Sequence, residues 1–124
     1  YGTGRLESQI EDLADVAASV HAKLGVCTTG NSLDKHDWDE KHMLENDASI
    51  KDMEAAAIAW SCSMSNNTPF MGVKVVTDIV DGFRPTDEEF LENLSHAAKS
   101  LQSSLPIIID HVCASNNDSP KAEL

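Results

Sequence analysis

Apolar positions recur along the first third of the chain at spacings that distinguish helix from strand. Residues 6–24 carry an apolar side chain every three or four positions, which predicts a helix that ends at Gly25. Residues 26–29 form a short, partly β-branched run that predicts a strand leading into a turn. From residue 34 to residue 47 the chain is polar and acidic, a composition that favours a loop.

The middle of the chain predicts a second helix and a second strand. Residues 48–64 are rich in Ala and Met, with apolar side chains three and four apart, and predict a buried helix that Asn66 to Pro69 break. Residues 70–80 are almost continuously apolar and β-branched. Such a run is typical of a central strand that is covered on both faces.

The last part predicts a long helix. Thr86 followed by Glu89 makes a capping box for its start, and Pro106 should kink or restart it. Beyond Ser115 the chain is polar, so residues 116–124 are expected to form a tail. Helices that alternate with strands indicate an α/β fold with a mostly parallel sheet. Because two predicted strands cannot make a sheet covered on both faces, the sequence favours a part of a larger domain or a chain that pairs tightly with another.

Composition narrows the class of partner. The chain has 124 residues, enough for one domain, and its net charge of −12 argues against nucleic acid and anionic membranes as ligands. No apolar run reaches the roughly 18 residues that a membrane span requires. Cys27, Cys62 and Cys113 form no CxxC pair and predict buried, reduced thiols, which favours a reducing, cytoplasmic location.

Two acids lie where the sequence otherwise predicts burial, and a buried carboxylate without partners costs several kcal/mol. Asp78 ends the predicted strand 70–80, where open α/β sheets bind their ligands, and a partly desolvated carboxyl there can keep a proton and act as a general acid. The alternative is a cap for the turn toward Gly82. Glu54 lies in the predicted helix 48–64 and needs donors, which a vicinal diol would supply; the alternative is a surface glutamate paired with Lys51.

Two weaker signals surround these acids. Residues 28–34 form a strand end and turn whose backbone groups could contact the edge of a purine. His36 and His42 lie in the acidic stretch, but their spacing fits no standard zinc or calcium pattern, so a solvated loop is favoured over a metal site.

In this order, these stretches resemble the nucleoside phosphorylase and nucleosidase superfamily, and within it the plant-type 5′-methylthioadenosine nucleosidases. Residues 49–59 (SIKDMEAAAIA) resemble the sugar-binding helix, and residues 69–81 (PFMGVKVVTDIVD) resemble the strand that carries the catalytic aspartate. Residues 85–94 are similar to the closing helix, and residues 28–34 to the adenine loop. The resemblance implies a three-layer αβα fold, of which residues 1–115 would be the C-terminal half of a single domain and residues 116–124 a polar tail.

The resemblance also implies a reaction, the hydrolysis of the N-glycosidic bond of 5′-methylthioadenosine, and of S-adenosylhomocysteine in some members. Asp78 would protonate N7 of the adenine, steadied by Thr77, and Glu54 would hold the ribose 2′- and 3′-hydroxyls. Met53 would pack against the sugar. The adenine edge would be met by Leu33 and Asp34.

It implies no metal or organic cofactor, and a homodimer or a complementary chain as partner. The glutamate that activates water in the family is expected upstream of this chain, and Asn31 replaces an aspartate that is usual there. Two alternatives stay open: phosphorolysis of a purine or uridine nucleoside, and a non-catalytic relative that serves as an assembly subunit.

Overall fold

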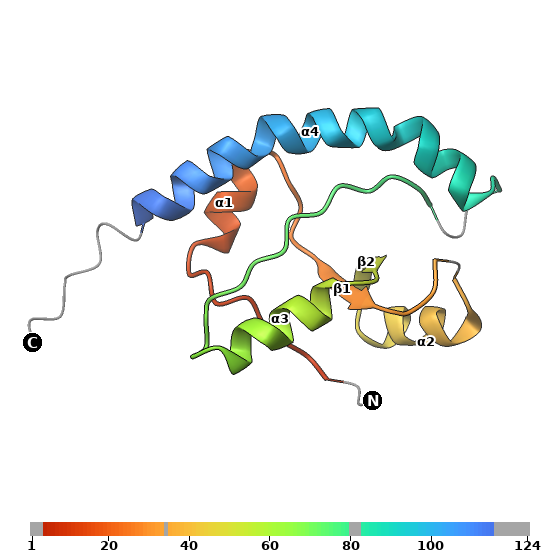
Figure 1. Ribbon diagram of the computed structural model, residues 1–124, viewed down its shortest axis with the longest axis horizontal. Coiled ribbons are helices and arrows are strands. Elements are labelled where there is room, and N and C mark those ends of the chain that lie inside the picture. Colours follow the sequence, from red (N-terminus) through yellow and green to blue (C-terminus); the bar gives the residue numbers. More distant parts are fainter. Residues whose placement is uncertain (1–3, 34, 80–82, 116–124) are drawn as a thin grey trace, which may run out of the picture.

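The computed structural model describes residues 4–33, 35–79 and 83–115, without the side chains of Thr86 and Ser115. Its elements follow the order α1, β1, α2, β2, α3, α4 (Figure 1). The expected capping box at Thr86 and the tail 116–124 lie outside the described side chains and residues.

In the described residues, the strands form one two-stranded parallel sheet. β1 (Val26–Thr29) pairs with β2 (Ala48–Asp52), with Cys27 opposite Ile50 and Thr29 opposite Asp52. The predicted strand 26–29 is therefore confirmed. The chain enters β1 at Gly25, where an added Cβ atom would lie only 2.7 Å from the Ser49 hydroxyl, so a larger residue there would displace the Ser49 side chain.

α1 (Leu13–Ser19) is much shorter than the predicted helix 6–24, and that prediction was wrong at both ends. The preceding residues are held by the segment around Phe70: the Ser8 hydroxyl donates to the Phe70 carbonyl at 3.0 Å, and the Gln9 side chain accepts from the Phe70 N–H at 3.1 Å. At the other end His21 adopts a positive φ of 55°, which ends the helix before Gly25.

α2 (Asp37–Glu45) occupies the stretch that was predicted to be a loop, so that prediction was also wrong. A capping box starts the helix, because the Asp39 carboxylate accepts from the His36 N–H at 3.0 Å while the His36 ring accepts from the Asp39 N–H. The helix has no buried residue. Its acidic first turn, which made the stretch look like a loop, favours the helix N-terminus instead.

The predicted helix 48–64 is divided between a strand and a helix. Its first five residues are β2, and only Ala55–Met64 form a helix, α3. Pairing with β1 overrides the helical spacing of residues 48–52, because one edge of this segment forms a parallel ladder with the neighbouring strand. The predicted end is correct, since Asn66 and Asn67 both take positive φ values just beyond α3.

Residues 68–79 run extended between α3 and α4 but form no strand, so the predicted central strand was wrong in the part that the structure describes (Figure 1). Side chains contact the backbone here. The Glu89 carboxylate accepts from the Ile79 N–H at 3.0 Å, and the Asn93 amide donates to the Thr77 carbonyl at 2.8 Å.

α4 (Thr86–Ser115) is one continuous curved helix with Pro106 inside it, so the expected restart does not occur (Figure 1). α1 packs against α4. The buried apolar residues of the described structure are few: Val16, Ala17, Ala59, Ala97 and Ile108. Helices around a parallel sheet confirm the predicted α/β class.

Candidate active site

The carboxyl ends of β1 and β2 lie side by side because the strands are parallel and Thr29 pairs with Asp52. Beyond β1 the chain turns through Gly30, whose N–H donates to the Asp52 carbonyl at 2.9 Å. Beyond β2 come Met53 and Glu54. This is the edge of the sheet at which open α/β folds bind ligands.

Asp52 is the best-connected acid at this edge, and its side chain is only 8% exposed. One carboxylate oxygen accepts from the Thr29 hydroxyl at 2.6 Å, and the other accepts from the Ala55 N–H at 2.9 Å. That second oxygen also forms an ion pair with Lys74 Nζ at 2.5 Å. The Thr29 hydroxyl accepts in turn from the Ala56 N–H at 3.0 Å, so β1, the start of α3 and the segment 68–79 meet at one carboxylate.

These contacts shift three pKa values. Burial alone would raise the pKa of Asp52, but the hydrogen bonds from Lys74, Thr29 and Ala55 together hold it below its ordinary value. The hydrogen bond to Asp52 raises the pKa of Lys74. Burial, followed by the negative charge of Asp52, raises the pKa of the Cys27 thiol to about 11. At neutral pH the site therefore holds a carboxylate, an ammonium and a neutral thiol.

Glu54 does not lie within a helix, as the sequence suggested, but is the N-cap residue of α3. Its carbonyl accepts from the Ile58 N–H, and its side chain is exposed. Met53 is exposed beside it. Glu54 is close enough to Lys74 for its charge to contribute to the raised pKa of that lysine. An acid at this helix end is favoured by the helix dipole and remains available to a ligand.

Thr77 and Asp78 lie near the end of the extended segment rather than on a strand, and both are half-buried. The Thr77 hydroxyl donates to the Asp78 carboxylate at 2.6 Å. The Asn93 amide anchors the Thr77 carbonyl to α4. Asp78 is thus held beside α4 by its neighbour's backbone.

Leu33 is 59% exposed and lines an apolar cavity of about 250 Å³ with Asp87, Phe90 and Leu91 of α4. Asp34 lies outside the described residues. The turn before it is fixed by Lys51, which donates to the Ser32 carbonyl at 2.7 Å and pairs with Asp39 at 3.1 Å.

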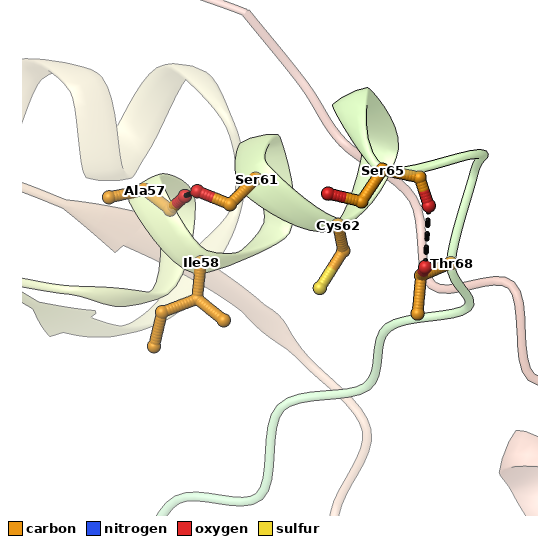
Figure 2. Close-up of a pocket in the computed structure, with 6 residues that line it drawn as sticks. All are labelled: Ala57, Ile58, Ser61, Cys62, Ser65 and Thr68. Atoms are coloured by element: carbon orange, nitrogen blue, oxygen red, sulfur yellow. Dashed lines mark hydrogen bonds between the residues drawn. The ribbon is translucent and has the colours of Figure 1, made fainter.

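A second hollow, of about 420 Å³, lies along α3 and the residues that follow it, and is shown in Figure 2. Its lining consists of Ala57, Ile58, Ser61, Cys62, Ser65 and Thr68. Neither of these two cavities is lined by Glu54 or Asp78.

The structure therefore links the two predicted acids through a residue pair that the sequence analysis did not single out. Asp52 precedes Glu54 by two residues, and Lys74 precedes Asp78 by four, so their ion pair joins the two stretches. A signal for the pair was present in the sequence, because Lys74 is the one charged residue between Pro69 and Thr77 and a packed apolar run favours a partner for such a charge.

The remaining expectations concern metals, membranes and cysteines. Within residues 4–33, 35–79 and 83–115, no group of three or more His, Cys, Asp or Glu side chains could hold a metal ion. No helix in this described part has the length and apolar character needed to cross a membrane. The three cysteines form no disulfide with one another, but none is buried as predicted: Cys27 and Cys62 are half-buried, and Cys113 is exposed.

Comparison with known proteins identifies the family. Residues 2–110 match the sequence pattern of the Phosphorylase superfamily. The chain belongs to this superfamily. The resemblance found in the sequence is thereby confirmed, and with it the phosphorylase-type fold.

The chain is similar to two curated proteins from Arabidopsis thaliana. One, named 5′-methylthioadenosine/S-adenosylhomocysteine nucleosidase, is 45% identical over 75% of the chain and 36% of its own length. The other, named 5′-methylthioadenosine nucleosidase, is 36% identical over 94% of the chain and 42% of its own length. The chain thus spans about two fifths of the length of these relatives.

Two solved structures of such nucleosidases are similar in fold to this chain. The apo structure of Arabidopsis thaliana 5′-methylthioadenosine nucleosidase matches with a TM-score of 0.74 and 37% identity, over 80% of this chain and 40% of the other. A crystal structure of the MTA/SAH nucleosidase matches with the same TM-score and coverage at 42% identity.

Proposed function

We propose that the chain forms part of an N-glycosidase that hydrolyses 5′-methylthioadenosine to adenine and methylthioribose. The observation that carries this proposal is the similarity, at 45% identity over 75% of the chain, to a relative named for that activity. The contacts at the carboxyl end of the sheet support it, since they bring the stretch that contains Glu54 to the one that contains Asp78.

In the proposed reaction Asp78 is the general acid. It donates its proton to N7 of the adenine as the bond between C1′ and N9 breaks and the bonding electrons move into the base. The hydrogen bond from Thr77 orients the carboxyl group that makes this transfer. General acid catalysis of this kind contributes about 10²- to 10⁴-fold to a rate.

Glu54 acts on the sugar in this proposal. Its exposed carboxylate accepts hydrogen bonds from the ribose 2′- and 3′-hydroxyls, and its negative charge favours the positive charge that develops at C1′ in an oxocarbenium-like transition state. Met53, exposed beside it, packs against the sugar. Leu33 and Asp34 meet the adenine edge, at a turn that Lys51 fixes through Ser32.

Water completes the reaction by attacking C1′ and giving up a proton. We propose that the base for this proton, like the rest of the pocket, belongs to the part of the fold that the relatives have and this chain does not span. Residues 1–115 would then be the C-terminal half of one domain, completed by further sequence or by a complementary chain. A homodimer and acceptance of S-adenosylhomocysteine belong to the same proposal.

Phosphorolysis is the competing reaction within the superfamily, and it needs cations for phosphate. The two lysines nearest the strand ends, Lys51 and Lys74, are already paired with Asp39 and Asp52. Their pairing favours hydrolysis.

The decisive experiment replaces the general acid in the complete enzyme, in which the rest of the fold is present. Asp78→Asn should lower adenine release by about 10²- to 10⁴-fold while adenine still binds, because the amide keeps the shape but cannot supply the proton. Asp110→Asn, an exposed acid on α4, is the control and should leave turnover unchanged. Near-normal turnover by Asp78→Asn would remove Asp78 from the role of general acid.

A further inference from the structure

Asp52 has no part in the proposed proton transfer or sugar binding, yet its carboxylate has the largest number of described partners at the candidate site. It contacts three separate pieces of the chain: the Thr29 hydroxyl at the end of β1, the Ala55 N–H at the start of α3, and Lys74 in the extended segment. All three partners are donors. Such a constellation fixes the carboxylate in one position.

The low exposure of the Asp52 side chain strengthens its contacts with these donors. With 8% of its side chain exposed, Asp52 has little water to replace a lost partner, so its ion pair with Lys74 is far less screened than an exposed pair. The exposed pair of Arg84 and Glu92, at 2.8 and 2.9 Å, is the contrasting case in the same chain. Both pairs join a carboxylate to a cation at hydrogen-bond distance, but only the carboxylate of Asp52 is shielded from water.

We propose that Asp52 is a positioning residue, which holds Glu54 and Asp78 in register with each other through Lys74 and the first turn of α3. The inference rests on the proposed function, because it assigns Asp52 to the same site. It concerns residues to which that function gives no role.

Short tethers connect this contact to both acids. Glu54 follows Asp52 by two residues, and the Ala55 N–H that binds Asp52 belongs to the residue directly after Glu54. Asp78 follows Lys74 by four residues of extended chain, which can span at most about 14 Å. A displacement of the Asp52–Lys74 ion pair would therefore also move Glu54 and Asp78. A misplacement of about 1 Å at reacting groups can lower the rate about 100-fold.

The test uses the complete enzyme and measures adenine release together with adenine binding. Asp52→Asn keeps the size of the side chain and removes its charge, and it should lower kcat about 100-fold with little change in the affinity for adenine. Glu92→Gln is the matched control: it makes the same change from acid to amide in an ion pair that lies outside the site, and it should leave kcat unchanged. Equal kcat values for the two variants would overturn the proposal.

The second arm acts on the partner and separates positioning from loss of stability. Lys74→Arg keeps the ion pair and should retain most of the wild-type kcat, whereas Lys74→Met should lower kcat as much as Asp52→Asn does. Combining Asp52→Asn with Lys74→Met should cost no more than either change alone, since both remove one interaction. Independent, multiplicative losses in the double variant would overturn the proposal.

Two further outcomes are informative. If Asp52→Asn fails to fold, the comparison of Lys74→Arg with Lys74→Met decides, because the Lys74 side chain is 36% exposed and tolerates replacement. If the wild-type complete enzyme releases no adenine, the proposed function is wrong, and the inference about Asp52 is wrong as well because it depends on that function. Failure of the inference alone leaves wild-type turnover, and the loss of activity in Asp78→Asn, intact.

Discussion

Asp52 is stable as a buried carboxylate because every contact that the structure describes for its oxygens comes from a donor. A carboxylate without partners at this depth would cost several kcal/mol and would take up a proton instead. The hydroxyl of Thr29, the N–H of Ala55 and the ammonium of Lys74 reverse that preference, and the pKa of Asp52 falls below its ordinary value.

This lowered pKa predicts how stability depends on pH. The unfolded chain binds a proton at Asp52 near its ordinary pKa of about 3.9, while the folded chain does so only at lower pH. The stabilisation by Asp52 is therefore fully present above about pH 4 to 5 and is lost as the pH falls through the lower, folded value. Asp52→Asn should lower the free energy of unfolding at pH 7 much more than at pH 2 to 3, as measured by urea denaturation.

The same measurement on Asp110→Asn gives the control, since that acid is exposed on α4. A difference between wild type and Asp52→Asn that stays constant from pH 7 to pH 2 would contradict the prediction, because it would mean that the carboxylate is not stabilised by charge.

At the scale of single elements, α2 shows how one side chain joins a helix to the sheet. The Asp39 carboxylate closes the capping box by accepting from the His36 N–H, and it also pairs with Lys51 of β2 at 3.1 Å. The Lys51 side chain is nearly buried. α2 therefore packs against β2 through polar contacts although it buries none of its own residues.

Asp39→Ala should destabilise the protein through this element. The loss of the cap alone costs about 1 kcal/mol, and a buried lysine left without its described carboxylate partner adds to it. Glu45→Ala is the control, because it removes only the long contacts of an exposed carboxylate with Lys41 and His42 at the far end of α2, and it should cost less than about 0.5 kcal/mol. Equal midpoints of thermal unfolding for the two variants would refute the dual role of Asp39.

At the scale of the whole molecule, the described structure buries few residues and exposes many large apolar ones. On α3, Ile58, Trp60 and Met64 are all more than half exposed, and the hollow of Figure 2 lies on this helix. The relatives of the same fold are about two and a half times as long as the matched part, since the chain covers 40% of the solved structures. We expect the remaining part of the phosphorylase-type fold to cover α3.

This expectation can be measured at Trp60. The protein is labelled with 5-fluorotryptophan, and the ¹⁹F resonance of Trp60 is assigned with the variant Trp60→Phe. In the 124-residue chain, the chemical shift of this resonance should change between H₂O and D₂O by the full amount typical of a solvent-exposed indole. The shift should be much smaller in the complete protein, because the indole is then covered. Equal shifts in the two samples would show that α3 faces solvent in both.

The local pattern of the sequence was sufficient where one interaction dominates. The strand Val26–Thr29, the break after Met64 and a helix before Pro106 were predictable, since β-branching, consecutive asparagines and a sustained apolar stripe each favour one conformation. The continuation of that helix through Pro106 was not. The family was predictable as well. Its motifs combine residue type with order along the chain, and neither depends on how the chain packs.

Tertiary contacts alone decided the rest. Residues 48–52 have helical spacing but pair with β1 as a strand. Residues 70–79 have the composition of a strand, but their backbone contacts side chains from α4 and from the N-terminal segment. The acidic stretch 37–45 forms a helix that contacts β2. Two of the three partners of Asp52, Thr29 and Lys74, are 23 residues before it and 22 after it, so no local pattern could pair them with it. The sequence by itself determined the family and is the source of the prediction for the two acids. The connection between the stretches that carry those acids depends instead on hydrogen bonds and an ion pair that form only when distant segments meet.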